Sequence, residues 1–101
     1  MFKFRDWGWW LVLWKGKHFK LKLIYFKKNK KLSYQRHEYR YELWLFLMGA
    51  GNMRNAGTLQ RGDFAMIEKN AWHQFIAGNR TLVLEVQFGE KCNEEDIERK
   101  E

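Results

Sequence analysis

The stretch FKLKLIYF, residues 19–26, alternates apolar and basic side chains with the period of two that is typical of a half-buried β-strand. Aromatic and aliphatic side chains occupy one face of this strand, and Lys20 and Lys22 lie on the other face. The 3.6-residue period of a helix does not fit the same stretch. We interpret the two lysines as part of a solvated face, with a basic rim that attracts anionic ligands as the alternative.

Other strand-like runs lie on both sides of this stretch. They cover Trp9–Trp14, Leu43–Met48, Phe64–Ile67, Trp72–Ile76 and Thr81–Phe88, with Gly and Asn residues between them. Short strands at regular spacing indicate an all-β sandwich or barrel. Residues 93–100 depart from this pattern, because Asn93 can cap a helix and the acidic residues after it favour the positive end of a helix dipole. We therefore expect a short C-terminal helical turn.

The length of 101 residues and the hydrophobic content of 46% allow one core, so residues 1–101 are expected to form a single domain. The chain has no apolar run of about eighteen residues, and the run at Trp9–Trp14 is too short for a signal peptide. We therefore expect a cytoplasmic protein without a membrane partner. The net charge of +7 is spread along predicted strands and does not indicate a nucleic-acid partner. The single Cys92 excludes an internal disulfide and a thiolate cluster, so a metal ion would need nitrogen and oxygen ligands.

Candidate metal ligands cluster in the stretch QRHEYRYE, residues 35–42. Gln35 and His37 project to the same face of an extended strand, and a turn could return the carboxylate of Glu42 toward them. His73 follows a predicted turn and is a candidate fourth ligand. Two imidazoles, one carboxylate and one amide oxygen suit Zn, Mn, Fe, Co or Ni. From the residues alone, His37 and His73 are as consistent with ordinary core or surface histidines as with ligands.

The same residues resemble two motifs of a known superfamily, the cupins. The segment from Leu32 to Gly49 resembles the first cupin motif, in which a glutamine or histidine, a second histidine, a glutamate and a glycine follow one another. The segment from Gly62 to His73 is similar to the second motif, which leads from a glycine to a histidine. The departures from the two motifs are Asn29, Glu68, Asn70 and Ala77, which replace glycine, proline, glycine and asparagine respectively.

Within the cupins, the chain resembles the C-terminal isomerase domain of type II mannose-6-phosphate isomerases, which is usually fused to a mannose-1-phosphate guanylyltransferase. Five short segments match that domain in order along the chain. They are WGW at 7–9 against PWG, LSYQRH at 32–37 against LSxQxH, RYELW at 40–44 against RxExW, EVQFG at 85–89 against EVQxG, and EDIER at 95–99 against DDIxR. Together the five segments span nearly the whole sequence.

The resemblance implies an all-β double-stranded β-helix, the jelly-roll barrel of cupins, with one divalent metal ion at its mouth. It implies that Gln35, His37, Glu42 and His73 bind the ion. These ligands do not fix the type of metal; we expect zinc, with Mn, Fe, Co or Ni as alternatives. The implied activity is the isomerisation of mannose 6-phosphate to fructose 6-phosphate through an enediol. Tyr39 and Leu43 stand where the family commonly has histidine. These departures favour the alternative of a non-catalytic metal-binding or sugar-binding cupin.

An isomerase of this kind also needs a base and a cation for the phosphate or the enediolate. Arg40 and Arg99 are the candidate cations, because a guanidinium stays charged and binds phosphate with two hydrogen bonds. Arg99 matches the tail arginine of the family, whereas Arg40 is also consistent with a surface salt bridge to Glu38 or Glu42. Glu85 is the candidate base, with a purely structural buried carboxylate as the alternative. A phosphorylated hexose is the expected substrate.

The strand at residues 43–48 has two apolar faces. Trp44, Phe46 and Met48 share the face of Glu42, so we expect these three side chains to fill the barrel interior. The leucines at positions 43, 45 and 47 point to the opposite side, where a second sheet or a partner must cover them. A homodimer formed through this face is therefore expected.

Overall fold

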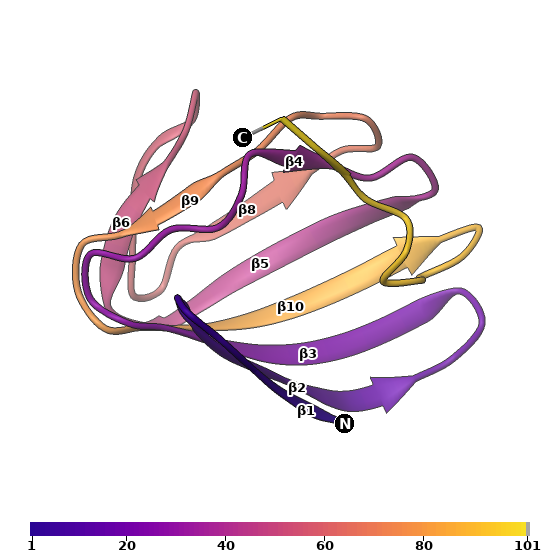
Figure 1. The fold of residues 1–101 in the computed structure, drawn as a ribbon, viewed down its shortest axis with the longest axis horizontal. Coiled ribbons are helices and arrows are strands. Elements are labelled where there is room, and N and C mark those ends of the chain that lie inside the picture. The colour runs from indigo at the N-terminus through magenta and orange to yellow at the C-terminus, as the bar shows by residue number, and fades with distance from the viewer. Residues whose placement is uncertain (101) are drawn as a thin grey trace.

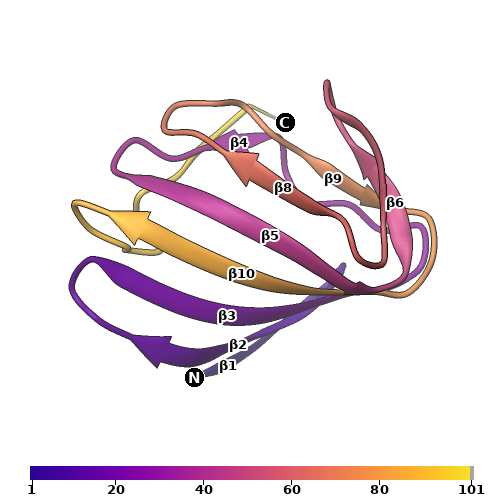
Figure 2. The same cartoon turned by 180° about the vertical axis from the view of Figure 1, so that it is seen from behind.

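The computed structural model describes residues 1–100, which form eleven β-strands and no helix. The strands are β1 (Phe2–Arg5), β2 (Gly8–Lys15), β3 (Phe19–Phe26), β4 (Gln35–Arg36), β5 (Arg40–Met48), β6 (Ala50–Met53), β7 (Gly57–Gln60), β8 (Phe64–Ile67), β9 (Phe75–Ala77), β10 (Thr81–Gly89) and β11 (Glu98–Arg99). Six strands form one sheet in the order β1-β2-β3-β10-β5-β8, which Figure 1 and Figure 2 show from opposite sides. A three-stranded sheet, β7-β6-β9, and a two-stranded ribbon, β11-β4, complete the fold. The prediction of an all-β fold is confirmed.

Aromatic rings pack the three-stranded sheet against the six-stranded sheet. Phe75 of β9 has its ring centroid 5.0 Å from that of Phe26 on β3 and 5.3 Å from that of Phe46 on β5. Trp44 of β5 lies 6.0 Å from Phe75 as well. These four side chains are at most 1% exposed, and full burial of one phenylalanine stabilises a fold by about 1.5–3 kcal/mol. The predicted interior positions of Trp44 and Phe46 are thus confirmed, whereas Met48, the last residue of β5, is 44% exposed.

Most of the predicted strands lie where the sequence pattern puts them. The runs at 19–26 and 64–67 match β3 and β8, and three other runs lie within the longer strands β2, β5 and β10. The strand predicted at residues 72–76 starts later in the structure: β9 begins only at Phe75. His73 before it forms an isolated bridge with Gln35. A turn closed by the Ala71 amide on the Glu68 carbonyl precedes this bridge and delays the start of the strand.

The prediction of a solvated lysine face on β3 is wrong for Lys20 and Lys22. These residues are 3% and 5% exposed, whereas Phe19 on the opposite face is 39% exposed. The reason lies in the second half of the strand, where Ile24 and Phe26 enter the core and fix which face points inward. Since side chains alternate strictly along a strand, the same face carries both lysines into the barrel.

The predicted C-terminal helical turn is also wrong. Residues 93–97 form a tight turn closed by the Asp96 amide on the Asn93 carbonyl, and β11 then pairs antiparallel with β4. The carboxylate of Asp96 accepts hydrogen bonds from the amides of Glu38 and Tyr39, at 2.8 and 2.9 Å. The polar groups of the tail therefore form hydrogen bonds with the segment before β5 and not within a helix.

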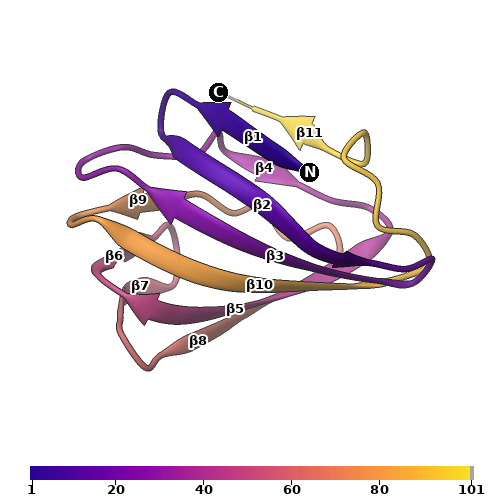
Figure 3. The same ribbon diagram turned by 90° about the horizontal axis from the view of Figure 1, so that it is seen from below.

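The inward faces of β3, β10 and β5 change from apolar to polar along their length. Strand pairing places Glu85 beside Lys22 on one side and Trp44 on the other, and it places Gln87 between Lys20 and Glu42. Figure 3 shows these three strands side by side and the twist of the sheet across them. One end of the barrel is thus an aromatic core, and the other end is a cluster of buried charges.

Within residues 1–100, no helix is long and apolar enough to cross a membrane.

Candidate metal centre

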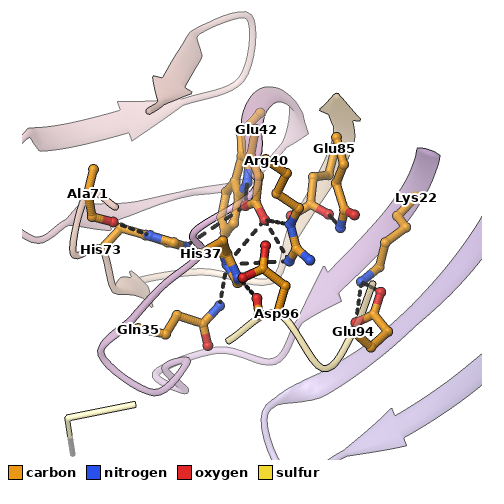
Figure 4. Close-up of polar contacts among 12 residues, drawn as sticks. Lys22, Gln35, His37, Arg40, Glu42, Ala71, His73, Glu85, Glu94 and Asp96 are labelled. Carbon is orange, nitrogen blue, oxygen red and sulfur yellow. Dashed lines mark hydrogen bonds and ion pairs between the residues drawn. The ribbon is translucent and has the colours of Figure 1, made fainter. Parts of the chain in front are cut away.

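Three buried side chains converge at the polar end of the barrel (Figure 4). His37 lies in the short segment before β5, Glu42 projects inward from β5, and His73 lies just before β9. The Nε2 atom of His37 is 3.2 Å from Oε2 of Glu42, and Nε2 of His73 is 3.9 Å from Oε1 of the same carboxylate. One atom from each of the three residues lies within 4.8 Å of the other two. Ligands of a single tetrahedral zinc ion lie about 3.4 Å apart, so this spacing suits one ion.

The backbone selects the tautomer of both histidines that leaves Nε2 available as a ligand. Nδ1 of His37 donates to the carbonyl of Asp96 at 2.7 Å, and Nδ1 of His73 donates to the carbonyl of Ala71 at 3.0 Å. A hydrogen bond of this kind from the outer nitrogen is usual for metal-binding histidines. Nε2 of His73 is buried without a hydrogen-bond partner among the described residues, which is costly unless a cation occupies the space before it. These observations fit a divalent ion.

Gln35 completes the predicted ligand set. Its side-chain nitrogen lies 3.5 Å from Nε2 of His37, and its oxygen is 2.8 Å from the hydroxyl of Ser33. Rotation of the amide exchanges its two ends, and the Ser33 hydroxyl can donate or accept. The oxygen of Gln35 can therefore face the centre without loss of the contact with Ser33. The structure brings all four predicted ligands together.

Arg40 is buried beside the carboxylate of Glu42 and is 4% exposed. Its Nε atom donates to Oε2 of Glu42 at 2.9 Å, and its Nη1 atom donates to the carbonyl of Asn93 at 2.7 Å. A third contact, 3.4 Å long, joins Nη2 to Nε2 of His37. The predicted pair with Glu42 exists, but it is buried and not a surface salt bridge. Through these contacts the guanidinium of Arg40 holds both Glu42 and the tail in place.

The ionisation of Glu42 and His37 suits metal binding. Burial opposes the charged form of Glu42, but the charges of His37 and Arg40 outweigh that penalty and hold its pKa well below the usual range. Burial is also the main cause that lowers the pKa of His37, which keeps the imidazole neutral near pH 7. A carboxylate and neutral imidazoles are the forms that coordinate a divalent ion.

Glu85 is the second buried carboxyl group of the cluster. Burial, followed by the charge of Glu42, raises the pKa of Glu85 to about 7. Its Oε1 atom accepts a hydrogen bond from Nε2 of Gln87 at 2.6 Å. Glu85 can therefore take up or release a proton near neutral pH, which is what a general base requires.

Replacement of Glu85 by Gln should change how the stability of the metal-free protein depends on pH. The folded-state pKa of Glu85 is raised from its ordinary 4.5 to about 7, so the folded protein binds more protons than the unfolded chain between these values. The stabilising contribution of Glu85 to the free energy of unfolding is fully present below pH 4.5. It is lost as the pH rises to 7, by up to about 1.4 kcal/mol per pH unit.

Urea unfolding of the wild type and of Glu85→Gln at pH 5, 6, 7 and 8 measures this difference. We expect the variant to gain stability relative to the wild type as the pH rises. The lowered pKa of His37 gives an opposite slope, but His37 is present in both proteins and cancels in the comparison. A difference in unfolding free energy that stays constant with pH would contradict the assignment.

A cavity of about 990 Å³ opens beside the metal centre. His37, Glu42, Gln35, Arg40, Glu85 and Arg99 all contribute to its wall, together with Lys20, Lys22 and Glu94. Arg99 comes from β11, directly opposite Gln35 in the strand pairing, and its side chain is exposed. The three predicted catalytic residues therefore line the same cavity as three of the four predicted metal ligands, whereas His73 does not contribute to its wall.

Four residues of this region were missed by the sequence analysis, namely Lys20, Lys22, Glu94 and Asp96. For the lysines a signal existed, because they share the strand phase of Ile24 and Phe26. Glu94 and Asp96 belong to the acidic run after Asn93, which is typical of a helix N-terminus. No local sequence pattern indicates that this run folds back over the barrel.

Comparison with solved structures identifies the fold. A double-stranded β-helix protein from Klebsiella pneumoniae matches with a TM-score of 0.77 and 12% identity, over 89% of this chain and 81% of that chain. A cupin-2 domain from Rhodospirillum rubrum matches with a TM-score of 0.76 and 19% identity, over 92% of this chain and 65% of that chain. These two likenesses show that the chain has a double-stranded β-helix fold, the jelly-roll barrel of cupins.

A match to a protein-family model identifies the family within this fold. The chain belongs to the mannose-6-phosphate isomerase C-terminal family, which matches residues 2–101. A sugar phosphate isomerase of the cupin superfamily from Silicibacter pomeroyi matches with a TM-score of 0.63 and 20% identity, over 70% of this chain and 50% of that chain. No curated protein matches the sequence. The chain is therefore a cupin that resembles sugar isomerases.

Proposed function

We propose that the protein is a metal-dependent sugar phosphate isomerase that interconverts mannose 6-phosphate and fructose 6-phosphate. The observation that carries this proposal is the buried group of His37, Glu42 and His73, two of which, His37 and Glu42, line a cavity whose wall also contains Glu85. Membership of the mannose-6-phosphate isomerase C-terminal family supports the choice of reaction. The metal ion we propose is zinc, because two imidazoles and a carboxylate form a common zinc ligand set.

The reaction moves a proton between two adjacent carbons of the sugar through an enediol. When bound, a divalent ion supplies Lewis acidity toward the oxygens on these carbons. His37, His73, Glu42 and Gln35 would hold the ion, and Arg40 positions the carboxylate of Glu42. Glu85 would take the proton from one carbon and return it to the next. Arg99 would balance the negative charge that develops at the cavity opening.

A coupled assay of the metal-loaded protein with mannose 6-phosphate tests the activity. We expect fructose 6-phosphate to form at a rate that disappears on chelation and returns when zinc is added. Manganese, iron, cobalt and nickel, added in parallel, identify the metal that supports the highest turnover. The absence of product with every metal would contradict the proposal.

The second candidate function is a non-catalytic cupin that binds a metal ion or a sugar. The observation that favours it is the presence of Tyr39 and Leu43 at positions where the family commonly has histidine. In the structure both side chains are only half-buried and neither belongs to the three-residue metal group. Binding of one metal ion per chain, without turnover of any hexose phosphate, would support this function.

We also propose that the protein is a cytoplasmic homodimer. Leu45 and Leu47 are 37% and 40% exposed on the outer face of β5, and Phe64 and Met66 on the neighbouring β8 are 69% and 53% exposed. The second sheet covers the opposite face of β5, so this apolar patch needs another cover. The mass of the protein in solution, measured by light scattering, tests the dimer.

A further inference from the structure

Lys20 and Lys22 form a buried pair of ammonium groups in the wall of the cavity. Both side chains point from β3 into the space that the metal centre borders (Figure 4 shows Lys22). Nζ of Lys20 is 2.9 Å from Oε2 of Glu94, and Nζ of Lys22 is 3.3 Å from each oxygen of the same carboxylate. Within residues 1–100, the ion pairs of both lysines go to Glu94.

One carboxylate does not balance two buried ammonium groups. Burial of a charged lysine is unfavourable unless an opposite charge compensates it. The other carboxyl group that faces Lys22 is Glu85, and burial raises its pKa to about 7, so it is about half protonated at pH 7. Arg40, further along the same wall, is already paired with Glu42. The lysine pair therefore retains an excess of positive charge, which a dianion would match better than one carboxylate.

The position of the lysine pair suits a ligand that also reaches the metal centre. Lys20 lies opposite Gln87, which in turn lies opposite Glu42, so two strand spacings, about 10 Å, separate the backbones of Lys20 and Glu42. Their side chains point toward the same cavity, which shortens this separation. An extended six-carbon sugar phosphate can bridge such a span, with its phosphate at the lysines and its carbonyl end at the metal centre.

We propose that Lys20 and Lys22 form a subsite for the phosphate group of a phosphate monoester, and that the carboxylate of Glu94 occupies this subsite until the phosphate displaces it. The identification of the monoester as a hexose 6-phosphate rests on the proposed function. Trp10, whose ring centroid is 4.0 Å from Nζ of Lys22, keeps that ammonium group in place during the exchange.

Glu94 can leave the lysines without unfolding the tail. The Asn93 carbonyl before it is bound by Arg40, and the Asp96 side chain after it is bound by the amides of residues 38 and 39. These anchors hold the backbone on both sides of Glu94. The side chain of Glu94 is 42% exposed, so rotation about its own bonds brings the carboxylate into solvent.

Isothermal titration of the metal-loaded protein with three probes tests the subsite. The probes are mannose 6-phosphate, inorganic phosphate and unphosphorylated mannose. We expect the first two to bind in competition with each other and mannose to bind much more weakly. Lys22→Met and Lys20→Met should each raise the dissociation constant of both phosphorylated probes by about tenfold or more, as expected for a charge-assisted hydrogen bond.

Glu94→Gln should have the opposite effect. It removes the competing charge, so the affinity for inorganic phosphate should rise by about two- to fivefold, the range of a partly exposed ion pair. Lys28→Met is the control, because it removes the same charge from an exposed turn outside the cavity. A purely structural lysine pair predicts that Glu94→Gln leaves phosphate affinity unchanged or lowers it, and this result would overturn the proposal even if the lysine variants fold poorly.

The outcomes separate this subsite from the proposed function. Phosphate binding that depends on both lysines, without isomerase activity, would support the subsite and contradict the isomerase. Isomerase activity with an unchanged KM in Lys22→Met would support the isomerase and overturn the subsite.

Discussion

Replacement of Glu42 by Gln should abolish the proposed metal binding and isomerase activity together. The carboxylate of Glu42 lies within 3.9 Å of both candidate histidine ligands, and the amide of glutamine cannot supply its charge. Loss of an outer partner of a metal ligand already weakens binding by about 10- to 100-fold, so loss of the ligand itself should exceed the upper end of that range. The metal content of the purified protein, measured by elemental analysis after zinc-supplemented expression, reports the effect.

The Glu42→Gln protein should also be less stable without metal. The substitution leaves the guanidinium of Arg40 buried without its partner, and breaking one side of a buried ion pair costs about 3–5 kcal/mol. His73→Ala removes a ligand without changing the pairing of Arg40, so it should lose most of the metal affinity with a smaller loss of stability. Glu38→Gln, an exposed carboxylate on the same segment, is the matched control. Normal metal content in both Glu42→Gln and His73→Ala would refute the proposed centre.

Replacement of Arg99 by Ala should lower the proposed turnover by about a hundred- to a thousandfold and leave the metal content intact. Loss of one group that stabilises transition-state charge commonly costs about 2.7–4 kcal/mol, which corresponds to this factor. Arg99 borders the cavity but is not among the residues that hold the ion. Steady-state kinetics with mannose 6-phosphate and parallel metal analysis test the separation of the two roles.

Arg36→Ala is the control for Arg99→Ala. Arg36 lies on the same two-stranded ribbon and donates to Glu98 at 2.7 Å, but it does not border the metal cavity. If the two variants lose the same activity, Arg99 acts by holding the ribbon in place and not by meeting substrate charge. Full activity in Arg99→Ala would show that the role transferred from the family is wrong.

The strands of this protein could be predicted from sequence because their signals are local. Alternation along residues 19–26 predicts the strand and which side chains share a face, although not which face points inward. The same rule alone places Gln35 and His37 together. Glu42 and His73 needed the family motifs as well, since no local rule brings residues so distant in sequence to one point.

The errors arose where burial or tail packing overrides local chemistry. Lys20 and Lys22 look like surface residues, but Ile24 and Phe26 fix the inward face of the strand and Glu94 compensates their charge. The tail has a sequence that favours a helix start, yet its hydrogen bonds to residues 38–40 are available only after the barrel has formed. Neither outcome can be derived from a short window of sequence.

If the proposed ion binds, the contact between the tail and His37 couples residues 93–100 to it. The carbonyl of Asp96 accepts a hydrogen bond from Nδ1 of His37 and thereby favours the tautomer in which Nε2, the proposed ligand atom, carries no proton. Thermodynamic coupling is reciprocal. If docking of the tail increases the affinity for the metal ion, then binding of the ion stabilises the docked tail by the same free energy. The exchange rate of amide hydrogens in residues 93–100 should therefore fall when the ion binds, at a distance along the sequence from every proposed ligand.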